Sequence, residues 1–151
     1  MADALPFFGI SPFVLGMTRE TVRAAAGEPA SIETTDDEER TLESWFYEGG
    51  SIELEFGEAP DARLESVTAW SAEVTLNGTS LIDAPVGELT RLAEAAGVPD
   101  LALADDFGDS GACWQSEAAS LMVWVVKGKV VNFTLFPRFD DAGDEPVWPE
   151  D

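Results

Sequence analysis

The side chains of this chain that could perform chemistry are mainly carboxylic acids. The 151 residues include 30 Asp and Glu, one cysteine and no histidine. The absence of histidine excludes a Ser-His-Asp triad, a Cys-His pair and histidine metal ligands. Cys113 has no basic residue close to it in the sequence that would favour its thiolate. We therefore expect Cys113 to be a small buried residue rather than a nucleophile.

The acidic residues could also bind a cation or act in pairs. Asp105, Asp106 and Asp109 could supply oxygen ligands to Ca²⁺ or Mg²⁺, but their spacing differs from that of an EF-hand loop and is typical of an acidic turn. Two carboxylates could hydrolyse a glycosidic bond, yet the sequence marks out no particular pair. We expect a protein that is not an enzyme and holds no metal or cofactor. A carboxylate-based enzyme is the least favoured alternative.

The charge of the chain restricts its partners. The formal net charge is −22, since only 8 residues are Lys or Arg. Such a surface repels nucleic acid and anionic membranes, and it attracts a basic protein. Solubility or adaptation to high salt is the alternative explanation of this charge.

Two predicted strands suggest where a protein partner would bind. One strand alternates between apolar side chains and the glutamates Glu53 and Glu55, and in a similar later strand Met122 and Trp124 take their places. Aromatic and methionine side chains rimmed by polar ones are typical of protein-binding surfaces. Burial of these side chains by the chain itself or by a homodimer is the alternative. The candidate partner-binding residues are Trp45, Glu53, Glu55, Trp70, Met122, Trp124 and Phe136.

Two short helices organise the elements that carry these residues. Thr18 is placed to cap the first helix, and Gly27 and Pro29 end it. A looser copy begins with Asp83 as its cap and ends near Gly97. We expect strands over residues 30–35, 41–47, 51–56, 63–70, 112–116, 121–126 and 130–136, a hairpin over 73–82, an edge strand or extended arm over 5–14 and an irregular segment over 100–111.

The order of helix and then three strands occurs twice, which predicts a tandem duplication. The fold class that we expect is α+β, with both copies forming one curved sheet and the helices on one face. The first copy covers residues 1–82 and the second covers 83–139. Residues 140–151 form an acidic, loosely ordered tail. The single cysteine and the lack of a basic, apolar leader or a long apolar run favour a cytoplasmic protein.

The first helix begins with the run Gly16-Met17-Thr18-Arg19-Glu20-Thr21-Val22 and closes with Gly27-Glu28-Pro29. This pattern resembles a motif of two related groups: the β-lactamase inhibitor proteins and the small lipoproteins of the outer-membrane barrel-assembly machinery. In both groups a Gly-Met-Thr-x-x-x-Val helix precedes an antiparallel sheet. The inhibitors are tandem duplications whose concave, aromatic-rich sheet grips a target enzyme, so the resemblance implies an inhibitor-like binding protein. The second copy lacks the Met-Thr pair. Small acidic immunity proteins are similar in surface and size.

Overall fold

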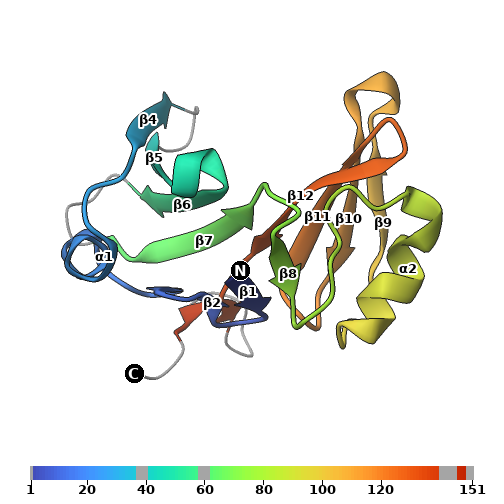
Figure 1. Ribbon diagram of the computed structural model, residues 1–151, viewed down its shortest axis with the longest axis horizontal. Coiled ribbons are helices and arrows are strands. Elements are labelled where there is room, and N and C mark those ends of the chain that lie inside the picture. Colours follow the sequence, from blue (N-terminus) through green and yellow to red (C-terminus); the bar gives the residue numbers. More distant parts are fainter. Residues whose placement is uncertain (1, 37–40, 58–61, 140–145, 149–151) are drawn as a thin grey trace.

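The computed structural model describes residues 2–36, 41–57, 62–139 and 146–148. Within these residues the chain forms two α-helices, an eight-stranded antiparallel sheet, a four-stranded mixed sheet and a two-stranded sheet (Figure 1). We call the first two sheets the large sheet and the small sheet. The α+β class expected from the sequence is confirmed.

The strands of the large sheet lie in an order that reverses at its centre. From one edge to the other they are β4 (Ser31–Asp36), β5 (Thr41–Tyr47), β6 (Ile52–Gly57), β7 (Leu64–Ala69), β12 (Lys129–Leu135), β11 (Leu121–Val126), β10 (Ala112–Ser116) and β9 (Ala102–Asp106). Helix α1 (Arg19–Ala26) precedes β4, and α2 (Val86–Ala95) precedes β9. Each half is therefore a helix followed by four strands, one more than the repeat in the sequence indicates.

The central pairing of the large sheet joins the two halves. Thr68 lies opposite Thr134, and their hydroxyl oxygens are 2.8 Å apart. The pairs on either side of this point are arranged symmetrically. Val67, before Thr68, faces Leu135, after Thr134, and Ala69, after Thr68, faces Phe133, before Thr134.

Irregularities of the backbone also recur in both halves. The register shifts after Glu55 where β6 meets β7, and after Trp124 where β11 meets β12. β-Bulges are specific local features, and here they fall at matching positions of the two halves. In this matching Glu53 corresponds to Met122, since these residues lie opposite Thr68 and Thr134.

The start of the second helix differs from the prediction. Asp83 is not its cap: α2 begins at Val86 with Pro85 at the N-cap position. Asp83 instead has a φ of +73° and its N–H donates to the carbonyl of Val130 at 2.8 Å. Gly16 makes the equivalent bond before α1. The first helix begins as expected, with the Thr21 N–H donating to the Thr18 hydroxyl at 3.2 Å.

Three further expectations need correction. The segment 100–111, expected to be irregular, contains β9, which pairs with β10. The predicted hairpin 73–82 is confirmed only at its Asn77-Gly78 turn, across which Leu76 and Thr79 exchange both backbone hydrogen bonds. Of its two expected strands only β8 (Val74–Leu76) forms, and it pairs in parallel with β1 (Ala2–Leu5). The arm 5–14 is not one strand: it contains the end of β1, β2 (Gly9–Ile10) and β3 (Phe13–Val14) of the small sheet. The order of that sheet is β3-β2-β1-β8, so of these three only β3 is an edge strand.

The tail is partly ordered. β13 (Arg138–Phe139) pairs with β14 (Pro146–Val147), and the Trp148 side chain packs over Gly16, where an added Cβ would lie 3.0 Å from it. The loose order expected for 146–148 is therefore wrong. Residues 140–145 and 149–151 lie outside the described residues.

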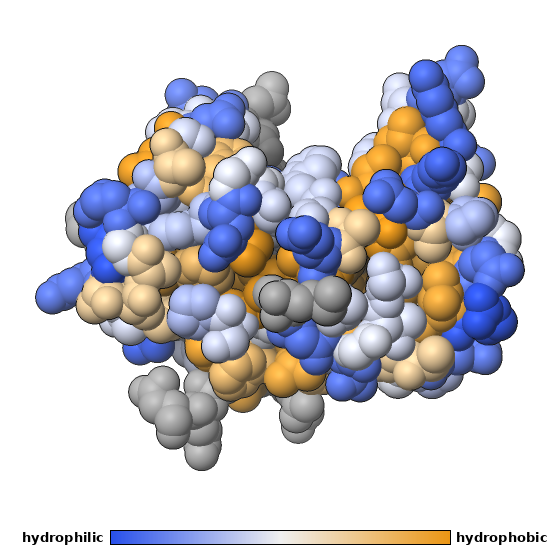
Figure 2. Space-filling model, viewed as in Figure 1, coloured by the Kyte–Doolittle hydropathy of each residue, from blue (hydrophilic) through white to orange (hydrophobic). Residues whose placement is uncertain are grey.

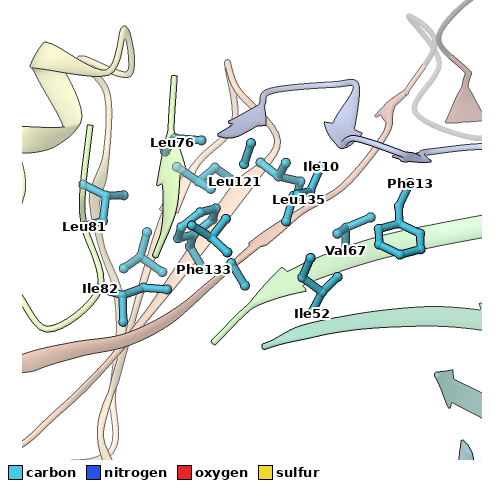
Figure 3. Packing of buried hydrophobic residues seen from close by; sticks show 14 of the residues in the cluster. Ile10, Phe13, Ile52, Val67, Leu76, Leu81, Ile82, Leu121, Phe133 and Leu135 are labelled. Carbon is cyan, nitrogen blue, oxygen red and sulfur yellow. The ribbon is translucent and has the colours of Figure 1, made fainter. Parts of the chain in front are cut away.

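The core lies between the large sheet and the small sheet (Figure 3). On β6, Ile52, Leu54 and Phe56 are buried, as the alternation of that strand predicts. The arm and β8 add Ile10, Phe13 and Leu76 from the small sheet, and both helices contribute buried residues such as Val22 and Leu89.

One polar network attaches α1 to the sheet. The Nε of Arg19 donates to Glu43 Oε1 at 3.1 Å, and the indole N–H of Trp45 donates to the same oxygen. Burial opposes ionisation of Glu43, but these hydrogen bonds and the charges of Arg19 and Arg23 outweigh it, so the pKa of Glu43 lies below its ordinary value.

We predict that Glu43→Gln lowers the free energy of unfolding by about 1–3 kcal/mol at neutral pH, because it removes the carboxylate charge that accepts from Arg19 and Trp45. A carboxylate with a lowered pKa stabilises the fold above its unfolded pKa, and this contribution is lost as the pH falls through the folded pKa. The difference between variant and native protein should therefore shrink below about pH 4.5, the ordinary value for Glu43. Urea unfolding across pH measures this.

Glu28→Gln, at an exposed ion pair with Arg23, is the matched control and should change stability by less than about 0.5 kcal/mol. An equal loss in both variants at every pH would contradict the prediction.

Candidate functional site

The candidate site is the side of the large sheet that faces away from the core, which we call the open face. Directly opposite residues of antiparallel strands share a face. The row of partners Phe46, Glu53, Thr68, Thr134 and Met122 therefore crosses the middle of this side. The other open-face residues used below are Glu55, Trp70, Trp124 and Phe136.

The molecule is hollowed at this side. Figure 2, in the same view as Figure 1, shows a depression in the upper outline between the part that carries β5 and β6 and the part that carries β10, β11 and β12. Hydrophobic and hydrophilic surfaces alternate along its walls (Figure 2). A partner with a convex surface would therefore contact both halves of the sheet.

Trp70 is the most accessible of the predicted aromatic residues. Its side chain is 44% exposed, and its indole N–H donates to Glu53 Oε1 at 2.9 Å. Its backbone N–H donates to the carbonyl of Ser51, which continues the β6–β7 pairing by one residue. In the second half Phe136 makes the equivalent bond to Ser120. Trp70 and Phe136 therefore occupy matching positions.

Further aromatic residues of the open face lie in the second half. Trp124 is half-buried, and its ring contacts that of Phe107 with centroids 5.8 Å apart. Phe107 is 55% exposed. Gly111 makes room for Trp124, since a Cβ there would lie 3.0 Å from the indole and 2.8 Å from the Val125 carbonyl. Met122 is also half-buried.

Trp45 is the one predicted partner-binding residue that lies in the core. It is fully buried on the core side, where its ring packs 5.0 Å from that of Phe56 and beneath the guanidinium of Arg23. The neighbouring Phe46 lies opposite Glu53 on the open face instead. Trp45 is therefore not part of the site.

Sequence reasoning missed two aromatic residues. Phe46 follows Trp45 directly, and two adjacent aromatics do not show which of them faces the core. The pairing of Phe46 with Glu53 would have placed it, once the register was known. Phe107 lies in the acidic segment expected to be irregular, so no alternation marked it.

The open face carries its acids in the first half. Glu53 and Glu55 are half-buried among its strands. In the second half Lys129, the exposed first residue of β12, lies opposite Val126, which continues the alternation of Met122 and Trp124, so this lysine lies at one end of the open face. Lys127 lies at the exposed turn before β12. The first half of the face is therefore the more acidic one and the second half is the more apolar one.

A pocket of about 280 Å³ lies beside the end of β7. Its lining includes the apolar Phe13 and Val74 and the exposed acids Glu48 and Glu73. Ser51 and Ser71 also line it. The carbonyl of Ser51 accepts from the backbone N–H of Trp70, and Ser71 follows Trp70 in the chain. The pocket therefore adjoins the backbone beside Trp70, and its other walls include the core residues Phe13, Ile52 and Val74.

The described residues contain no group of three His, Cys, Asp or Glu side chains placed to hold a metal ion. Asp106 accepts the N–H of Gly108 at 2.9 Å, which is a local turn. Cys113 is buried. In the part of the chain that the structure describes, no helix has the length and apolar character needed to cross a membrane.

Comparisons with protein-family models, with curated proteins and with solved structures found no match for this chain.

We predict that the negative surface around Trp70 is visible in fluorescence. Of the five tryptophans, Trp70 alone is exposed, and it touches a carboxylate. We divide each quenching constant by that of free N-acetyltryptophanamide. On this scale caesium ions should quench the emission more than iodide does. The bias should disappear in Trp70→Phe and remain in Trp148→Phe. Stronger scaled quenching by iodide in the native protein would contradict the assignment of a negative surface there.

Proposed function

We propose that this chain is a non-enzymatic protein-binding module that docks a basic partner on its open face, in the manner of an inhibitor or an immunity protein. The observation that carries the proposal is the joining of the exposed Trp70 and further aromatic side chains with the half-buried acids Glu53 and Glu55 on one sheet face. Aromatic side chains supply most of the binding energy at such surfaces, and complementary charge speeds association.

The proposal includes a tandem duplication, with both helices on one side of a single curved sheet. It is supported by the symmetric pairing at Thr68 and Thr134, by the matching bulges and by the matching bonds before each helix. Helices that cover only the core side leave the opposite side available to a partner. We also propose a cytoplasmic location, which is compatible with a single cysteine and hence no internal disulfide.

Charge argues against a homodimer through this face. Each copy has a formal net charge of −22, and the open face contributes Glu53 and Glu55 to it. Bringing two such faces together would place like charges in contact, which costs free energy unless each is paired. A basic partner removes this cost. Sedimentation that shows a stable dimer with buried tryptophans would contradict the proposal.

We predict that Trp70→Ala combined with Phe136→Ala weakens the binding of the natural partner by at least about tenfold, since a central aromatic commonly contributes about 2 kcal/mol or more. The tagged full-length chain should capture the partner from cells that make it. Mass spectrometry then identifies it, and calorimetry with the purified partner gives the affinity. The partner should be basic.

The control variant combines Ile32→Ala with Leu103→Ala. These residues are similarly exposed, at 44% and 49%, but they lie opposite Trp45 and Trp114 on the other side of the sheet. The control should bind like the native chain. Docking on the open face would be contradicted if the purified partner bound the open-face variant as tightly as the native chain, or if both variants lost the same amount of affinity.

A further inference from the structure

We infer that Trp70 and Glu53 form a receptor for one arginine side chain of the partner. This inference rests on the proposed function and names the chemistry that its first contact recognises. Glu53 lies on β6 and Trp70 directly follows β7, the neighbouring strand, in the acidic half of the open face.

The hydrogen bond between the two side chains leaves both available to a cation. Trp70 donates its indole N–H to Glu53 Oε1 at 2.9 Å, so this bond orients the ring relative to the carboxylate. A carboxylate has about four acceptor positions, so one indole N–H leaves it able to accept from a guanidinium. The ring remains 44% exposed, and an aromatic ring face attracts a cation.

Arginine fits this pair better than lysine does. The guanidinium is planar, so it can stack on an indole while its N–H groups donate to a carboxylate in the same site. An ammonium is a compact, strongly hydrated charge that gains less from stacking. The acids Glu48 and Glu73 of the adjoining pocket add negative potential around the same strand end.

The second half of the sheet provides an internal comparison. Phe136 and Met122 occupy the positions that match Trp70 and Glu53. This pair has neither an indole N–H nor a carboxylate, so it cannot recognise a cation in the same way and suits an apolar side chain. Two matching positions of one fold thus differ in the chemistry that they recognise, which would fix the orientation of a partner on the face.

The test titrates the full chain with n-butylguanidinium and, separately, with n-butylammonium. The readout is the indole N–H resonance of Trp70, assigned by its loss in Trp70→Phe. We expect saturable shifts with the guanidinium, tighter binding of it than of the ammonium, and an affinity about fivefold lower in Glu53→Gln. Glu94→Gln removes the same charge from an exposed position on α2 and should leave the affinity unchanged.

Three results would overturn the inference: no saturable shift at Trp70, equal losses in Glu53→Gln and Glu94→Gln, or tighter binding of the ammonium. The double variant Trp70→Phe with Glu53→Met copies the second half and lacks the indole signal, so its backbone amide resonances along β6 and β7 are followed instead. Guanidinium binding retained there would also overturn the inference. These probes need no partner. If these titrations fail but the variant Trp70→Ala with Phe136→Ala still loses binding of the identified partner, only the arginine receptor is rejected. If the partner still binds that variant, the proposed function is rejected.

Discussion

The antiparallel contact of β7 with β12 is the constraint on which the rest of the structure depends. It is centred on the facing threonines Thr68 and Thr134, whose hydroxyls bond to each other at 2.8 Å. Because side chains alternate across a strand, this register determines which residues of both halves face the core and which face solvent. A shift by one residue would bury Thr68 and Thr134 and expose the apolar residues beside them. The open face therefore exists as one surface only while this pairing holds.

The two halves share a backbone plan but differ in the chemistry that they present. Where the first half has Glu53 and Glu55 on the open face, the second half has Met122 and Trp124. The backbone can therefore stay the same while the surface is divided into an acidic part and an apolar part. A partner that is basic on one side and apolar on the other would fit this division in one orientation. The net charge of −22 would attract such a partner over long distances, and the aromatic contacts would then hold it.

Local signals predicted much of this fold, and long-range pairing determined the remainder. The caps of α1 and the alternation in β6 and β11 depend on neighbouring residues, so the sequence shows them directly. β9 was not predicted because its acidic residues are all exposed and show no alternation; it is a strand because β10 provides a partner. Asp83 resembles a helix cap in sequence, but its backbone is held by Val130, which is far away along the chain. For the site, Trp45 was assigned to the wrong side since it adjoins a second aromatic residue, and only the register distinguishes the two.

The central claim is that the open face is accessible in the free protein while Trp45 is sealed in its core. Hydroxyl-radical footprinting of the isolated chain, at low and at high protein concentration, tests this most directly. The account predicts rapid oxidation of Trp70, Met122 and Phe136 at both concentrations, with Trp45 protected throughout. Protection of the three open-face residues at either concentration, or oxidation of Trp45 as fast as that of Trp70 in the folded protein, would contradict it.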